Sequence, residues 1–134
     1  MKTAGSMDIP GKYLSVTSYR RDGTPVATPV WFVRDGDRIL VETDAESGKV
    51  KRMRGNPAVS VAACTASGRL RGARMDARVE ILGPEALEPE RRLMGRKYRV
   101  DRILVLPIYR AAQKLRGKAG VGEHPVVLSI TPDG

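Results

Sequence analysis

Four cationic side chains crowd a short segment in the middle of the chain, directly after an apolar run that predicts a strand. They are Lys49, Lys51, Arg52 and Arg54. The free backbone N–H groups at a helix start attract anions, and the helix dipole repels cations there. Because Lys49 is expected in or near the first helical turn, a bound phosphate would relieve this repulsion. The pattern predicts an anion site, and the alternative is a solvated basic helix face.

Start and stop signals bound this predicted helix. Thr43 and Glu46 have the spacing of a capping box, Gly55 stands where a helix would end, and Pro57 prevents its continuation. We therefore expect a helix over about residues 45–54.

Helical geometry divides the four cations between two flanks. With an advance of about 100° per residue, Lys49 and Arg52 share one flank of the apolar side. Lys51 and Arg54 share the other flank. One pair is therefore placed to close on a ligand beside the neighbouring strand.

The composition limits the class of protein and of partner. The chain has 134 residues, of which 41% are hydrophobic, which is enough for one domain with a real core over residues 1–134. The net charge of +9 favours phosphates, carboxylate-rich ligands, nucleic acid or anionic lipid. Aromatic residues make up only 4% and no known nucleic-acid-binding motif is present, so nucleic acid is the least favoured of these partners.

Histidine and cysteine are too few for most metal or nucleophilic sites. His124 is the only histidine, and no cluster of cysteines accompanies it, so neither a metal site nor a catalytic triad is expected. Cys64 is the only cysteine, which excludes an intramolecular disulfide and favours a buried packing role in the apolar run 59–64. No stretch has the length of a membrane span and no signal peptide is evident, so we expect a soluble cytoplasmic protein.

Alternating apolar and polar side chains predict a protein built mainly from strands. The first three predicted strands are joined by short turns and form a meander. Strands at this spacing with hairpin links favour a small antiparallel barrel. The predicted strands are residues 13–19, 25–33, 38–43, 58–65, 75–81 and 126–131.

The second half of the chain is expected to add short helices. One is predicted over 85–98, with Pro89 in its first turn, and another over 108–115. A glycine-rich and basic loop at 115–123 then leads to the last strand. The termini, residues 1–11 and 132–134, are expected to be loosely held.

Three segments together resemble one family. The first is Gly-Thr-Pro-Val-Ala-Thr-Pro-Val-Trp-Phe at 23–32, the second is the strand–helix unit 43–57 with its Ser47-Gly-Lys49 step, and the third is Val-Ser-Val-Ala-Ala-Cys at 59–64. They resemble the FMN-binding split β-barrel family related to pyridoxamine 5'-phosphate oxidase, in particular its branch of F420-dependent oxidoreductases. The resemblance spans about residues 12–131 and implies a split β-barrel, mainly β with short helices, that forms a homodimer.

The resemblance also implies where the ring of a flavin-like cofactor would lie. In the family one strand runs along the ring, which places Thr28, Pro29, Val30 and Trp31 beside it. A proline within a strand belongs at an edge or a bulge, so nearby backbone groups are free for a ligand. The alternatives are that Pro29 only keeps an exposed sheet edge from pairing with another strand and that Trp31 anchors a core or a dimer interface.

The family binds the cofactor phosphate at the start of the helix after the third strand. The matching positions here are Thr43, Ser47 and Lys49, with Arg52 one turn later on the same flank. Related flavin oxidases commonly carry Arg-Lys after the serine, whereas this chain has Gly-Lys. This departure removes one cation directed at the phosphate, and Lys51 and Arg52 are the candidates to replace it.

The function implied by the resemblance is hydride transfer from reduced F420, a deazaflavin, to an unsaturated or quinone-like small molecule. The acidic polyglutamate tail of F420 would suit the positive charge of the chain. The cofactor carries the chemistry, so no catalytic side chain is assigned, and none is assigned to the acceptor within 83–124. The alternatives are an FMN-dependent oxidoreductase or oxidase, and a protein that binds a flavin, a deazaflavin or a tetrapyrrole without turnover.

Overall fold

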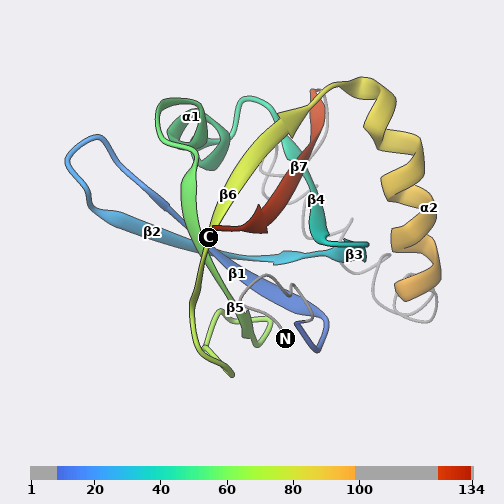
Figure 1. Ribbon diagram of the computed structural model, residues 1–134, viewed down its shortest axis with the longest axis horizontal. Coiled ribbons are helices and arrows are strands. Elements are labelled where there is room, and N and C mark those ends of the chain that lie inside the picture. The colour runs from blue at the N-terminus through green and yellow to red at the C-terminus, as the bar shows by residue number, and fades with distance from the viewer. Residues whose placement is uncertain (1–8, 99–123, 134) are drawn as a thin grey trace, which may run out of the picture.

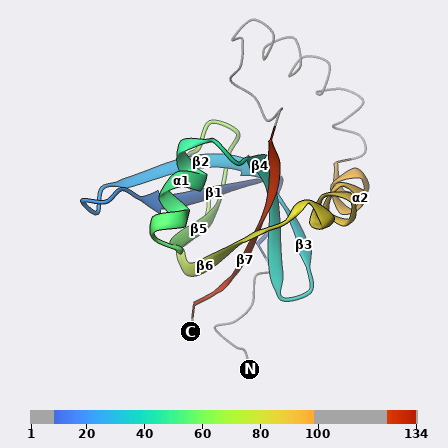
Figure 2. The same ribbon diagram turned by 90° about the horizontal axis from the view of Figure 1, so that it is seen from above.

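The computed structural model describes residues 9–98 and 124–133, and a single curled antiparallel sheet dominates these ranges (Figures 1 and 2). Seven strands form this sheet in the order β2-β1-β5-β6-β7-β4-β3. The prediction of a mainly β, barrel-like fold is confirmed. The strands are β1 (Tyr13–Tyr19), β2 (Pro25–Trp31), β3 (Val33–Asp35), β4 (Arg38–Asp44), β5 (Ala58–Cys64), β6 (Met75–Leu82) and β7 (Pro125–Pro132).

The predicted strand 25–33 is two strands rather than one. Pairing stops at Phe32, whose side chain is buried in the core. Before this break β2 pairs with β1, and after it β3 pairs with β4. The two strands therefore lie at opposite edges of the sheet, and the predicted three-stranded meander is wrong. The second neighbour of β1 is β5, and that of β4 is β7.

Two α-helices accompany the sheet in the described ranges: α1 (Gly48–Gly55) and α2 (Leu87–Lys97). A 3-10 turn, η1 (Pro84–Ala86), leads into α2, so the predicted helix 85–98 is confirmed, with Pro89 in the first turn of α2. Neither α-helix is long and apolar enough to cross a membrane. The predicted helix 108–115 and the loop 115–123 lie outside the described residues.

Helix α1 begins later than predicted. Thr43 remains in β4, and the Asp44 carboxylate accepts a hydrogen bond from the Glu46 N–H at 2.7 Å. Ser47 is the residue that caps the helix, since its Oγ accepts from the Val50 N–H at 3.4 Å. The predicted capping box between Thr43 and Glu46 is therefore wrong, because the strand continues to Asp44.

Two groups of buried apolar side chains hold the elements in place. The larger group fills the curl of the sheet, and α1 contributes Val50 and Met53 to it. The smaller group lies between the sheet and α2, with Tyr98 at its centre. Figure 1 shows the two helices on separate parts of the sheet, with α2 beyond β3. The helix with the four cations is thus anchored by its apolar side, which leaves its flanks available to a ligand.

Candidate functional site

Lys49 reaches back from the first turn of α1 to β4. Its Nζ donates a hydrogen bond to Thr43 Oγ1 at 2.9 Å, and Thr43 is only 3% exposed. Burial and, second, the positive charge of Arg52 lower the pKa of Lys49, while Asp44 opposes this shift. A desolvated ammonium group next to another cation gains from a bound anion.

Arg52 lies one turn later on the same flank and reaches β1. Its Nε donates to Ser18 Oγ at 2.7 Å. Its guanidinium also lies against the start of α1, because a Cβ atom built at Gly48 would come within 3.0 Å of Arg52 Nη1. Burial and then the positive charge of Arg20 lower the pKa of Arg52. Gly48 therefore leaves the space that Arg52 occupies.

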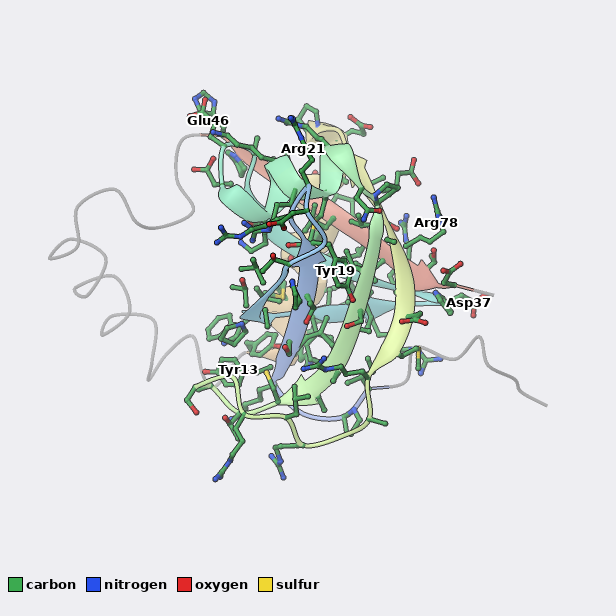
Figure 3. The ribbon with its side chains drawn as sticks, turned by 90° about the vertical axis from the view of Figure 1, so that its left-hand side faces the viewer. Tyr13, Tyr19, Arg21, Asp37, Glu46 and Arg78 are labelled. Carbon is green, nitrogen blue, oxygen red and sulfur yellow. The ribbon has the colours of Figure 1, made fainter. Side chains whose placement is uncertain are left out.

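A pocket rich in arginine and lysine opens where the turn between β1 and β2 meets α1. It has a volume of about 510 Å³. Two of its cations come from the turn after β1 and two from α1, and no acidic side chain in the described part of the chain lines it. Figure 3 shows Tyr19 and Arg21 on the strand and turn beside α1. The residues that line this basic pocket are Tyr19, Arg20, Arg21, Lys51, Arg52, Gly55 and Asn56.

The sequence-based prediction missed Ser18, Arg20 and Arg21. These residues meet α1 through a tertiary contact between the β1–β2 hairpin and the helix, which local patterns do not encode. A tight turn closes the hairpin, with the Gly23 N–H donating to the Arg20 carbonyl oxygen at 2.8 Å. The only available signal was a pair of arginines beside an Asp-Gly turn.

The predicted ring-contact residues lie along β2. This strand is at an edge of the sheet, and Pro29 pairs with Ser15 of β1 on its inner side. An edge strand tolerates proline, which has no backbone N–H to donate to a neighbouring strand. Thr28 is half-buried, and the Val30 side chain packs against the main core. The contact of Thr28, Pro29 and Val30 with a cofactor ring stays a prediction.

Trp31 is half-buried and packs against the apolar group around Tyr98. Its ring stacks on Tyr98, with 4.5 Å between centroids and 6° between planes. Tyr98 is fixed in turn, because its Oη accepts from the Phe32 N–H at 3.1 Å and lies 2.6 Å from the Lys12 carbonyl oxygen. The structure contains the packing contact considered for Trp31, and contact between Trp31 and a cofactor ring stays a prediction. Thr43, Lys49 and Arg52 lie together, whereas Trp31 lies at the other end of the β1–β2 hairpin from Arg52.

Of the two residues set aside on sequence grounds, Cys64 lies at the end of β5, and His124 lies beside the turn before α1, where its carbonyl oxygen accepts a hydrogen bond from the Ala45 N–H at 2.7 Å. Cys64 is 5% exposed, as predicted for a packing residue, and burial raises the pKa of its thiol. His124 Nε2 lies 3.7 Å from the Glu46 carboxylate. Within residues 9–98 and 124–133, no group of three or more histidine, cysteine, aspartate or glutamate side chains is arranged to hold a metal ion.

The sequence matches a known family over most of its length. Residues 12–118 fit the family described as pyridoxamine 5'-phosphate oxidase. The chain belongs to this family. Its curled antiparallel sheet is accordingly the split barrel of pyridoxamine 5'-phosphate oxidases.

Three solved structures of similar fold are of proteins whose names refer to different ligands. An F420 reductase is 18% identical, with a TM-score of 0.56 over 92% of this chain and 87% of that one. A pyridoxamine 5'-phosphate oxidase-related FMN-binding protein from Nostoc punctiforme is 17% identical, with a TM-score of 0.56 over 90% and 70% of the two chains. HutZ, a heme storage protein from Vibrio cholerae, is 16% identical, with a TM-score of 0.60 over 92% and 82%. These similarities establish the fold, and no curated protein matches the sequence.

Proposed function

We propose that this protein is an F420-dependent oxidoreductase that passes a hydride between the deazaflavin and an unsaturated or quinone-like small molecule. One observation carries the proposal: cations extend without a break from Lys49, through Arg52, into the basic pocket. When bound, the cofactor supplies the hydride chemistry. The residues of the chain bind and orient it.

The donors at the start of α1 suit a phosphate group. Lys49 supplies an ammonium, Arg52 supplies a planar fork of N–H donors, and Ser47 and Thr43 supply hydroxyl groups. The space at Gly48 lets Arg52 take the place of the cation that related oxidases carry after the serine. These residues would hold the phosphate of either F420 or FMN.

The basic pocket favours F420 over FMN. The phosphate of FMN ends that molecule, whereas F420 continues past its phosphate into a tail of glutamates. Arg20, Arg21 and Lys51 offer positive charge beyond what one phosphate needs. In this proposal the three side chains hold the tail, and the edge strand β2 lies along the ring at Pro29.

The proposal includes a homodimer, as the family resemblance implies. Light scattering coupled to gel filtration tests this element, and a purely monomeric protein would exclude it.

Titration with F420, followed by cofactor fluorescence, tests the proposed function. We expect binding in the micromolar range or tighter, and the double variant with Lys49→Ala and Arg52→Ala should weaken it at least tenfold, or about 1.4 kcal/mol. Arg54→Ala is the matched control, because Arg54 is an exposed cation of the same helix that does not line the pocket. It should change affinity less than about twofold.

Several results would contradict the proposal. No binding at about 10 µM F420 would exclude the function, and equal losses in the double variant and in Arg54→Ala would exclude the site. A yellow purified protein that releases FMN on denaturation would decide for the FMN-dependent alternative. Tight cofactor binding without hydride transfer to a broad panel of acceptors would instead indicate a binding protein.

A further inference from the structure

A second pocket lies between α2 and the start of β3 and has a volume of about 380 Å³. The β1–β2 register places it at the far end of the hairpin from the basic pocket, since Tyr13 pairs with Trp31 and Tyr19 with Pro25. In Figure 1, α2 stands well away from the β1–β2 turn. The residues that line this α2 pocket are Ile9, Phe32, Val33, Arg34, Leu93, Arg96 and Lys97.

Among the described residues, the charged lining of the α2 pocket is entirely positive. Arg34, Arg96 and Lys97 contribute, and none of the acidic side chains of residues 9–98 and 124–133 lines the pocket. Neither acid of α2 lines the pocket: Glu88 lies 3.7 Å from Arg92, and Glu90 is buried beside Glu42 of β4. Within the described ranges, neither Arg96 nor Lys97 forms an ion pair. Arg96 and Lys97 thus bring to the pocket positive charge that no described carboxylate offsets.

Lys97 is held in the pocket by neutral groups. Its Nζ donates to the Phe32 carbonyl oxygen at 2.9 Å and lies 3.3 Å from the centroid of the Phe32 ring. The Tyr98 ring is 5.2 Å away. Burial lowers the pKa of Lys97 to about 8, because carbonyl and ring only partly replace the lost water. A bound anion would complete the stabilisation of this ammonium group.

The rest of the lining is apolar, from Ile9 on one side to Leu93 on the other. We propose that the α2 pocket binds a small organic carboxylate, with its charged group held by Arg96 and Lys97 and its hydrocarbon part against Leu93 and Ile9. Pockets that pair an apolar wall with a few convergent charged groups are the usual sites for such ligands. This binding requires no redox cofactor and is independent of the function proposed above.

Trp31 provides a direct readout. It is the only tryptophan of the chain, it precedes Phe32, and it stacks on Tyr98, the neighbour of Lys97. Hexanoate is the probe, 1-hexanol is the neutral molecule of the same length, and acetate is the charge without the hydrocarbon. We expect hexanoate to change Trp31 fluorescence saturably and to bind at least about tenfold more tightly than either control. Calorimetry, which does not depend on Trp31, repeats the comparison.

Variants assign the binding to the pocket. Arg96→Ala should weaken hexanoate binding at least about fivefold, since it removes one of two groups that hold the carboxylate. Arg92→Ala on the same helix, outside the pocket, should leave it within about twofold. Circular dichroism checks the fold of each variant, and Arg96→Gln replaces Arg96→Ala if the latter is unfolded.

The pH dependence provides a further test of Lys97. The other charged groups that share the pocket are Arg34 from β3 and Arg96 from α2, and Tyr98 beside it is hydrogen bonded. Between pH 7 and 9.5, Lys97 loses its proton, so hexanoate affinity should fall at least about fivefold in the natural protein and less than about twofold in Lys97→Arg. Equal affinity for hexanoate and 1-hexanol, or no effect of either Arg96 substitution, would overturn the proposal.

Discussion

At the scale of single residues, Gly48 has no side chain, and this leaves room for the Arg52 guanidinium at the start of α1. A Cβ atom there would lie 3.0 Å from Arg52 Nη1, so Gly48→Ala should push the guanidinium away from the start of α1. The same change should stabilise the helix by up to about 1 kcal/mol, because alanine is the better helix former. We expect F420 affinity to fall about threefold while the free energy of unfolding in urea rises.

Arg54→Ala is the control for this prediction. It also places an alanine in α1, at an exposed position that does not line the basic pocket. F420 affinity should therefore change less than about twofold. If Gly48→Ala binds F420 as the natural protein does, the orientation of Arg52 does not matter for binding.

Glu90 is a buried acid with an unusual environment. Its side chain is fully buried in α2, and neither carboxylate oxygen accepts a hydrogen bond within the described part of the chain. Burial first, and then its contact with Glu42 of β4, raises the pKa of Glu90 to about 8. Glu42 itself stays ionised, because Arg91 binds it through two hydrogen bonds of 2.7 and 3.0 Å. Glu90 is therefore a protonated acid at neutral pH.

This ionisation makes stability depend on pH. The folded protein holds the Glu90 proton up to about pH 8, whereas the unfolded chain releases it near 4.5. Its contribution is therefore complete below about pH 4.5 and is lost as pH rises through 8. Glu90→Gln, which cannot ionise, should melt within about 2 °C of the natural protein at pH 5.5 and at least about 3 °C higher at pH 9.

Thermal melting across this range, followed by circular dichroism, checks the prediction. Lys97 titrates in the same range, but it is common to both proteins and cancels in their difference. Glu88→Gln, an exposed position of the same helix, should show no such trend. A difference in melting temperature that is constant from pH 5.5 to 9 would show that Glu90 does not titrate there.

At the scale of elements, the start of α1 combines a helix cap with a proposed phosphate contact, both at Ser47. Aspartate caps a helix about as well as serine does, so Ser47→Asp should keep α1 within about 0.5 kcal/mol of its present stability. The added carboxylate would repel a phosphate beside Lys49, so F420 affinity should fall at least about tenfold. Urea unfolding and fluorescence titration measure the two effects separately.

Ser47→Ala separates the two roles from the opposite side. It should cost about 1 kcal/mol of stability through the lost cap, with a smaller loss of affinity than in Ser47→Asp. If Ser47→Asp binds F420 normally, the phosphate does not lie at the start of α1.

The elements themselves were largely predictable from the sequence. The alternating runs located β1 and β6, and the helix after β4 was predicted although its start was not. Two failures have one cause. The break at Phe32 and the pairing of β1 with β5 depend on contacts between segments far apart in the chain, and periodicity reports only which side of a strand is buried. Local patterns therefore found the strands and the hairpin pairs β1–β2 and β3–β4, but not the pairings between segments far apart in the chain.

At the scale of the whole molecule, the candidate site was predictable only where it is local. Lys49 and Arg52 share a flank because of helix geometry, which the sequence determines. Arg20 and Arg21 reach the same region through the curl of the sheet, which brings the β1–β2 turn to α1. The net charge of +9 indicated an anionic ligand but not where the charge would gather. The fold supplies that location by joining two basic segments.

The positive charge gathered at the basic pocket predicts that cofactor affinity depends on salt concentration. The phosphate beside Lys49 is partly shielded from solvent, whereas the exposed Arg20, Arg21 and Lys51 are open to screening. Between about 50 and 500 mM NaCl, the Debye length falls from roughly 14 to 4 Å. If the basic pocket holds the glutamate tail, F420 affinity should fall at least about fivefold over this range, and the fold-change in FMN affinity should be less than half as large.

Fluorescence titrations of both cofactors at each salt concentration make the comparison. Arg21→Ala should reduce the salt dependence of F420 binding and leave that of FMN binding unchanged. Equal salt dependence for the two cofactors would mean that the tail does not lie in the basic pocket.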